Sequence, residues 1–268
     1  MKNCAVAMHQ HSFLFVYRKL IVKFSILKAH FSRGSYDRGA KGGDPMDYRH
    51  EWKHEISFTD MVALRHRLGA VMQRDENAKD GKYFIRSLYF DNAADKALRE
   101  KLDGVNNREK FRIRYYNLDP SLIHLEKKSK RNGLGSKTQA ELTAAEAQSI
   151  VDGDWEWMKD DDRPLVRELY SKIQSQGLRP KTIVDYTREP FVYGPGNVRV
   201  TLDYDIRTGL RSTDFLNPDC VTVPAGDAPI ILEVKWDTFL PSIIREIVQL
   251  EGRHTSAFSK YAICRIYD

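Results

Sequence analysis

Long hydrophobic runs are absent from this chain of 268 residues. No stretch reaches the roughly 18 consecutive apolar residues that a membrane helix needs. The nearest is residues 13–31, which Arg18, Lys19, Lys23 and Lys28 interrupt, so we expect no transmembrane segment. The same stretch has no clean small-residue cleavage site and is not typical of a signal peptide. A basic helix lying on a membrane surface is the membrane-related interpretation that remains for it.

Cysteine is scarce as well, since the chain has only Cys4, Cys220 and Cys264. Their spacing matches no metal site, and an odd number does not suit a framework of paired disulfides. A reducing compartment is the simplest interpretation, so we predict a cytoplasmic protein.

The excess of one charge sign is also small. Lysine and arginine total 43 against 37 aspartate and glutamate, which gives a formal net charge of +6. This excess suits nucleic acid, an acidic membrane or a small polyanion, so the placement of the charges has to decide among them. Hydrophobic residues make up 41% and aromatic residues 11%, which is enough for a packed core and argues against extensive disorder.

The character of the chain changes near Met46. Residues 1–45 end in a stretch rich in glycine and charge, and we expect a flexible N-terminal extension or an over-extended start. Residues 46–268 predict one domain. Runs of β-branched and aromatic residues predict eight strands, at 48–56, 83–90, 108–116, 121–129, 181–193, 197–204, 228–235 and 260–267. Capping and stop signals predict helices at 59–74, 92–103, 143–152, 162–176 and 240–251.

These elements predict an α+β fold, an eight-stranded antiparallel β-barrel with helices packed on the outside, because eight strands can close and remove all edges. Side chains alternate between the two faces of a strand. In the strand 108–116, Lys110, Arg112 and Arg114 share a face opposite Phe111 and Ile113. The strands 48–56, 121–129, 197–204 and 228–235 also carry a charged face.

Two interpretations of the charged faces compete. In most antiparallel sheets the charged face meets water and the apolar face forms the core. In the inverted arrangement the apolar faces pack under the helices and the charged faces line a lumen. Several long helices need an apolar sheet face to cover, which favours inversion. An acidic and a basic residue also recur two positions apart on three strands, as Glu51 with Lys53, Glu126 with Lys128, and Glu233 with Lys235.

A lumen rich in cations must stay hydrated or hold a counter-charge, because unpaired buried charge is costly. The nine candidate cations are Lys53, Arg112, Arg114, Lys128, Lys137, Arg188, Arg199, Lys235 and Lys260. Glu51, Glu126 and Glu233 are the candidate anions, which leaves a surplus of six positive charges. A compact polyanion such as a triphosphate suits this surplus, since guanidinium groups hold phosphate oxygens in pairs. The carboxylates would then bind Mg²⁺ or Mn²⁺.

The stretch Gly133-Leu-Gly-Ser-Lys-Thr138 resembles a phosphate-binding loop only superficially. It lacks the adjacent Gly-Lys-Ser/Thr and the glycine five residues earlier that such a loop needs. We predict a hairpin loop here that delivers Lys137 into the lumen.

Eight segments, taken in order, resemble the polyphosphate polymerase domain of the vacuolar transporter chaperone (VTC) family. They are Arg49-His-Glu-Trp-Lys53, Ser87-Leu-Tyr-Phe-Asp91, Lys110-Phe-Arg-Ile-Arg114, Leu125-Glu-Lys-Lys128, Tyr186-Thr-Arg188, Val198-Arg-Val-Thr-Leu-Asp203, Leu232-Glu-Val-Lys235 and Phe258-Ser-Lys-Tyr261. That domain belongs to the triphosphate tunnel metalloenzymes, a CYTH-like superfamily, so the resemblance implies an eight-stranded tunnel. The first segment opens with Arg49, as the polymerase branch tends to, where the wider superfamily has glutamate.

The resemblance implies roles at the matching positions. The phosphate-gripping residues would be Lys53, Arg112, Arg114, Lys128, Lys137, Arg188, Arg199 and Lys260. Tyr186 and Ser259 would be auxiliary phosphate contacts, and Glu233 the metal-binding carboxylate. Lys235 and Glu51 are further expected substrate contacts, and Glu126 is a second expected metal ligand.

The resemblance thus implies a metal-dependent phosphoryl transferase that uses ATP to extend polyphosphate, with Mn²⁺ or Mg²⁺. Coupling to polymer export would need a membrane partner protein. A tunnel triphosphatase or cyclase-like enzyme and a non-catalytic polyphosphate sensor remain alternatives. Nucleic-acid binding is disfavoured, because it predicts a basic exterior with exposed stacking aromatics.

Overall fold

The computed structural model describes residues 49–131, 134–250, 252 and 258–266. All described residues lie in the unit Met46–Asp268. The predicted extension over residues 1–45 therefore falls outside the described part of the chain. No helix in the described residues is both long enough and apolar enough to cross a membrane.

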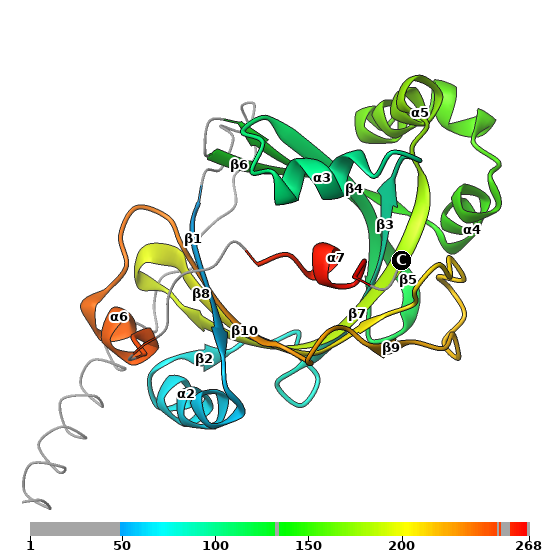
Figure 1. The fold of residues 1–268 in the computed structure, drawn as a ribbon. Helices are drawn as coiled ribbons and strands as arrows, with labels where there is room; N and C mark the ends of the chain where they lie inside the picture. Colours follow the sequence, from blue (N-terminus) through cyan, green and yellow to red (C-terminus); the bar gives the residue numbers. More distant parts are fainter. Residues whose placement is uncertain (1–48, 132–133, 251, 253–257, 267–268) are drawn as a thin grey trace, which may run out of the picture. The chain divides into compact units, whose positions relative to one another are not determined.

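One antiparallel sheet organises the domain and curls around a central space (Figure 1). Eight strands follow one another across it in the order β1-β10-β8-β7-β3-β4-β5-β6, with β2 beside β7 and β9 beside β8. Their bounds are β1 His50–Ile56, β2 Gln73–Arg74, β3 Tyr83–Asp91, β4 Arg108–Tyr116, β5 Asp119–Arg131, β6 Leu134–Leu142, β7 Arg179–Tyr193, β8 Val198–Thr208, β9 Val223–Pro224 and β10 Ile230–Trp236. The predicted α+β class and the eight-stranded antiparallel sheet are confirmed. Among the described residues no ladder joins β1 to β6, so the curl is an open barrel.

Two predictions for the strands were wrong. Residues 134–138, predicted as part of a hairpin loop, belong instead to the strand β6. This strand pairs with β5 from Ile123↔Leu142 to Arg131↔Leu134. The predicted strand 260–267 is instead the short helix α7, Lys260–Ile263, with Ser259 as its N-cap accepting a hydrogen bond from the Ala262 N–H at 3.3 Å. Tyr261 and Cys264, three residues apart, are both buried, which is the spacing of a helical face.

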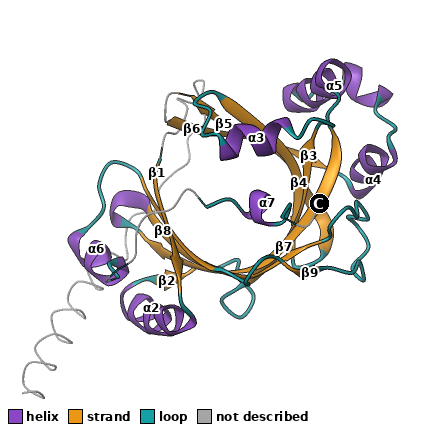
Figure 2. Cartoon of the chain, in the orientation of Figure 1, coloured by secondary structure: helices purple, strands orange, loops and turns teal. Residues whose placement is uncertain are grey.

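The outer face of the sheet carries two helical layers. The helices α4 (Ala144–Asp152) and α5 (Pro164–Gln176), with the 3₁₀ turn η1 (Glu156–Asp160), cover apolar side chains of β3, β4 and β5 such as Leu88, Phe111 and Ile113. The helices α2 (Phe58–Val71) and α6 (Ser242–Val248) cover those of β8 and β10 such as Val200 and Val234. Figure 2 shows both layers outside the sheet.

Two other elements belong to the central space. The helix α3 (Lys96–Leu102) lies across one side of the curl, and α7 lies inside it (Figure 1). The ring of Tyr261 in α7 stacks on Tyr89 of β3 at a centroid distance of 5.0 Å, and its hydroxyl donates to Asp91 at 2.7 Å. The expectation that helices pack on the outside therefore holds for α2, α4, α5 and α6, while α7 fills part of the interior.

Candidate functional site

The charged faces of the strands line the interior of the curl, as the inverted arrangement predicts. Phe111 and Ile113 are buried under α4 and α5, whereas Lys110, Arg112 and Arg114 border an internal cavity. The cavity has a volume of about 900 Å³, which is large enough for a nucleotide-sized ligand. The predicted site residues that line it are Glu51, Lys53, Arg112, Arg114, Lys128, Lys137, Arg188, Arg199, Glu233, Lys235 and Ser259.

The remaining predicted residues, Tyr186, Lys260 and Glu126, contact members of this lining or the acids that hold them. Arg114 donates hydrogen bonds to the Tyr186 hydroxyl at 3.1 Å and to the Ser87 hydroxyl at 2.9 Å. The structure therefore gathers all the predicted residues around one interior.

A first cluster of ion pairs centres on Glu126 of β5, which is only 1% exposed. Arg112 Nε donates to Glu126 Oε2 at 2.6 Å, and Lys137 Nζ lies 2.6 Å from Oε1. Burial alone would raise the pKa of Glu126, but Arg112, Arg114 and Lys137 outweigh it and hold that pKa well below its usual range. Because cations engage both of its oxygens, these contacts favour a counter-charge role for Glu126, and the predicted metal role remains a prediction.

A second cluster of ion pairs centres on Glu233 of β10. Its Oε1 lies 3.4 Å from Lys53 Nζ and 3.1 Å from Lys235 Nζ, and its Oε2 lies 3.2 Å from Arg188 Nη2. Glu51 contacts the same two lysines, at 2.8 Å and 3.5 Å. Burial alone would raise the pKa of Glu233, but Lys235, Lys53 and Arg188 hold it well below its usual range, so the carboxylate is ionised.

Asp203 of β8 is a buried acid for which the sequence predicted no role. Arg188 holds it with two hydrogen bonds of 2.7 Å, and Lys260 Nζ lies 2.6 Å from Oδ2. The carboxylate is fully buried. Its alternation with Arg199 and Thr201 on one strand face was the available signal, but nothing in the sequence marks it as the acid that positions Arg188 and Lys260.

Lys110 and Lys128 are cations without an acidic partner in the described residues. They face each other in the β4–β5 register, where like charges directly opposite are destabilising. Burial, together with nearby cations such as Lys235 and Arg112, lowers the pKa of Lys128 well below its usual value. Burial also lowers the pKa of Lys110 to about 8. A bound anion would favour the protonated, positively charged form of both lysines.

Tyr89 lies beside these cations and accepts a hydrogen bond from Arg112 Nη1 at 2.7 Å. Burial alone would raise the pKa of its hydroxyl, but Arg112, Lys110 and Arg114 outweigh burial and lower that pKa to about 7. Tyr89 therefore carries growing negative charge above neutral pH, close to the residues expected to bind phosphate.

We expect the affinity for tripolyphosphate to fall as pH rises above neutral, first because Tyr89, with its pKa of about 7, ionises and then because Lys110, with its pKa of about 8, loses its proton. Tyr89→Phe should delay the fall until Lys110 titrates. Calorimetric titrations across this pH range measure both curves, and Tyr170→Phe on α5 is the matched control. Identical pH profiles for the wild type and Tyr89→Phe would contradict the assignment.

The site has few ligands for a metal of its own. The described residues contain no group of three or more His, Cys, Asp or Glu side chains arranged to hold an ion. Mg²⁺ is commonly bound by one or two carboxylates together with substrate phosphates. Glu233 and Glu51 share two lysine neighbours and are the carboxylates that would hold a metal arriving with a phosphate ligand; cations engage both oxygens of Glu233, as at Glu126, and its predicted metal role remains a prediction.

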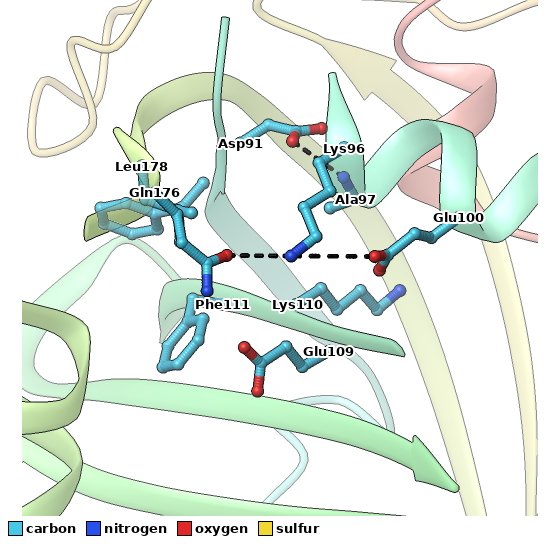
Figure 3. A pocket seen from close by; sticks show the side chains of 10 residues that line it. Asp91, Lys96, Ala97, Glu100, Glu109, Lys110, Phe111, Gln176 and Leu178 are labelled. Carbon is cyan, nitrogen blue, oxygen red and sulfur yellow. Dashed lines mark hydrogen bonds and ion pairs between the residues drawn. The ribbon is translucent and has the colours of Figure 1, made fainter. Parts of the chain in front are cut away.

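A second, smaller cavity lies between α3, β4 and the end of α5 (Figure 3). Lys96 Nζ donates to Gln176 Oε1 at 3.0 Å within it and lies 3.9 Å from Glu100 Oε1. Its volume of about 20 Å³ is room for roughly one water molecule. It is too small for a substrate.

Comparison with known families decides the assignment of the fold. The model of the VTC domain matches residues 48–266, which covers the whole described part of the chain. The chain belongs to the VTC domain family. The resemblance carried by its ordered strand motifs is thereby confirmed.

Comparisons outside the VTC domain family are distant. No curated protein matches the chain. Among solved structures, the PH1819 protein from Pyrococcus horikoshii is 13% identical with a TM-score of 0.44, over 81% of this chain and 97% of its own. The PH1012 protein from the same organism is 14% identical with a TM-score of 0.43, over 80% and 98%. Such likenesses carry no functional argument, so what supports binding or transfer of triphosphate-type substrates is the VTC domain itself and its cationic interior.

Proposed function

We propose that this VTC-domain protein is a metal-dependent phosphoryl transferase that uses ATP to extend inorganic polyphosphate. The observation that carries the proposal is a single cavity lined both by Lys110 and Lys128, for which the described residues offer no acidic ion-pair partner, and by the carboxylate of Glu233. A carboxylate on the wall of an anion site can position a cation, as Glu126 does for Arg112, or can hold a metal ion. A site that aligns a metal-bound triphosphate needs both cations and such a carboxylate.

The reaction moves the terminal phosphoryl group of ATP to an oxygen of phosphate or of a growing chain. The bond from the terminal phosphorus to the bridging oxygen breaks, a new phosphorus–oxygen bond forms to the acceptor, and ADP leaves. Such transfers need mainly alignment and charge neutralisation. Arg112 and Arg114 supply planar guanidinium groups for the phosphate oxygens, and Lys128 supplies a point charge. No nucleophilic side chain is required.

The acids of the site position the cations. Glu126 orients Arg112 and Lys137, and Asp203 orients Arg188 and Lys260. Glu233, with Glu51, would hold Mn²⁺ or Mg²⁺. When bound there, the ion would supply positive charge to the phosphate oxygens. We further propose that the protein acts in the cytoplasm and that any export of the polymer requires a membrane partner.

Product analysis with purified full-length protein, ATP and Mn²⁺ tests the proposal. We expect polyphosphate detected by staining, with ADP formed in proportion to the phosphate units added. Release of phosphate from tripolyphosphate without polymer would replace the proposal with a tunnel triphosphatase. Tight polyphosphate binding without any turnover would replace it with a sensor.

A further inference from the structure

The interior helix α7 brings two of the predicted phosphate contacts into the curl. Ser259, its N-cap, borders the cavity, and the Lys260 ammonium lies 2.6 Å from Asp203 Oδ2. The helix has only four residues, and a helix this short is not stable in water by itself. Its position, and with it the position of Lys260, must therefore come from contacts with the rest of the fold.

Asp91, the last residue of β3, joins α7 to α3 through one buried carboxylate. Its Oδ1 accepts a hydrogen bond from the Ala97 N–H at 2.9 Å, and its Oδ2 accepts one from the Leu98 N–H at 3.1 Å, both in the first turn of α3. The Tyr261 hydroxyl of α7 donates to the same Oδ2 at 2.7 Å. Burial and the Asp91 carboxylate raise the pKa of Tyr261 well above its usual value, so the hydroxyl keeps its proton and remains a donor.

Arg265, which follows α7, makes a second connection between the same two helices. Its guanidinium donates to the Tyr261 hydroxyl at 2.7 Å and to Oδ1 of Asp95, the N-cap residue of α3, at 2.9 Å. Arg265 is buried, where a hydrogen bond is electrostatically stronger than in water. The Tyr261 hydroxyl therefore lies at the centre of a closed set of bonds that fixes α7 against the start of α3.

Tyr261 also adjoins the predicted site. Its ring stacks on Tyr89 at a centroid distance of 5.0 Å, and Tyr89 accepts a hydrogen bond from Arg112 Nη1 at 2.7 Å. Lys260 is the preceding residue of α7, and its ammonium lies 4.7 Å from the centre of the Tyr186 ring. A shift of Tyr261 would therefore move the backbone of Lys260 with it. Because the ring stack and the hydroxyl bonds are separate contacts, one substitution can remove the bonds and keep the stack.

We propose that Tyr261 and Asp91 are positioning residues of the phosphate-binding site: their hydrogen bond fixes α7 on α3 and so sets where the Lys260 ammonium meets the ligand. This inference rests on the proposed function in taking Lys260 as a phosphate contact. The lysine ammonium is a point charge on a flexible stem, so its contribution to binding depends on where its backbone is held. A bond that only stabilises the fold would lower stability without changing the contribution of Lys260.

Calorimetric titration of metal-free tripolyphosphate into Tyr261→Phe tests the proposal, because phenylalanine keeps the ring that stacks on Tyr89 and loses only the hydroxyl. The matched control is Tyr204→Phe. The Tyr204 hydroxyl also bonds a buried carboxylate, that of Glu189 at 2.9 Å, but neither residue is among the described residues that line the cavity. Urea unfolding of both variants measures the stability that each hydroxyl contributes.

A third variant, Lys260→Met, removes the ammonium that the bond is proposed to position. Arg188 still holds Asp203 with two hydrogen bonds of 2.7 Å, so this variant should fold. Combining Lys260→Met with Tyr261→Phe gives a double-mutant cycle, which measures whether the two side chains act together.

Tyr261→Phe should bind tripolyphosphate about three- to tenfold more weakly than the wild type, whereas Tyr204→Phe should stay within about twofold of it, although both variants should lose stability. In the Lys260→Met background, Tyr261→Phe should cause less than about a twofold further loss, because the group that it positions is gone. Equal affinities of the wild type and Tyr261→Phe, or losses that simply multiply in the double variant, would overturn the inference. Absence of ATP-driven polymer with these affinities as expected would instead refute only the proposed function.

Discussion

Glu233→Gln should reduce metal-dependent turnover of ATP at least about a hundredfold, because a correctly placed metal contributes several kcal/mol of transition-state stabilisation. The substitution keeps the size of the side chain but removes the ionised oxygens that lie between Lys53, Lys235 and Arg188. The initial rate of ADP formation with Mn²⁺ measures the effect.

Binding without metal separates this role from loss of the site. Because a neutral amide would leave three neighbouring cations less neutralised, we expect Glu233→Gln to bind metal-free tripolyphosphate at least as tightly as the wild type. Glu168→Gln on α5, whose carboxylate pairs with Lys127 outside the cavity, is the matched control and should retain full turnover. Wild-type turnover in Glu233→Gln would refute the metal assignment.

Arg188→Ala should lower the free energy of unfolding by about 3–5 kcal/mol, the cost of breaking a buried ion pair from one side. Arg188 makes two 2.7 Å hydrogen bonds to the fully buried Asp203 and also contacts Glu233. Without it, the ammonium group of Lys260 is the ion-pair partner that the described chain still offers to Asp203. Urea unfolding of the apo protein measures the change.

The comparison for this prediction is Arg67→Ala, which removes an exposed arginine from α2 and should leave stability nearly unchanged. Arg188→Lys should recover part of the loss, because an ammonium group replaces one of the two bonds to Asp203. An Arg188→Ala protein as stable as the wild type would show that the buried pair contributes nothing to the fold.

The interior arrangement could be predicted because one strand shows it clearly. In β4, Arg112 and Arg114 alternate with Phe111 and Ile113, so one face had to pack in a core and the other had to meet either water or a polar lumen. The pairs of acid and base two residues apart, such as Glu233 with Lys235, likewise placed both partners on the inner face. Alternation is a local property, so the sequence alone showed which residues share a face, and the helices that need an apolar face to cover favoured the inverted arrangement.

The two segments whose secondary structure was predicted wrongly, β6 and α7, lack such a local signal. The strand β6 reads LGSKTQAEL, with polar residues on both faces, and it exists because β5 offers it a ladder of hydrogen bonds. The segment at Tyr261 is a short apolar run, and such runs do not distinguish a strand from a helix. Its helical form depends on tertiary contacts inside the curl, with Tyr89 and Asp91 of β3.

The pairing of particular acids with particular bases was the other feature that could not be predicted from the sequence. The charged faces predicted which residues point inward, but not which acid neutralises which base. Asp203 became important only when β7 and β8 brought it opposite Arg188. Conversely, Lys110 shared a face with Arg112 in the sequence, and only the register showed that it faces Lys128 without an acid between them.

Calorimetric titration of tripolyphosphate into the wild type and Lys128→Met tests the central claim that this interior binds a polyanion. The pKa of Lys128 is lowered by burial and by neighbouring cations, so replacing it should leave the apo protein at least as stable. We expect one ligand per wild-type chain and roughly ten- to a hundredfold weaker binding in Lys128→Met, since a hydrogen bond to a charged group contributes about 1.5–3 kcal/mol. Equal affinity in the two folded proteins, or no saturable binding by the wild type, would contradict the claim.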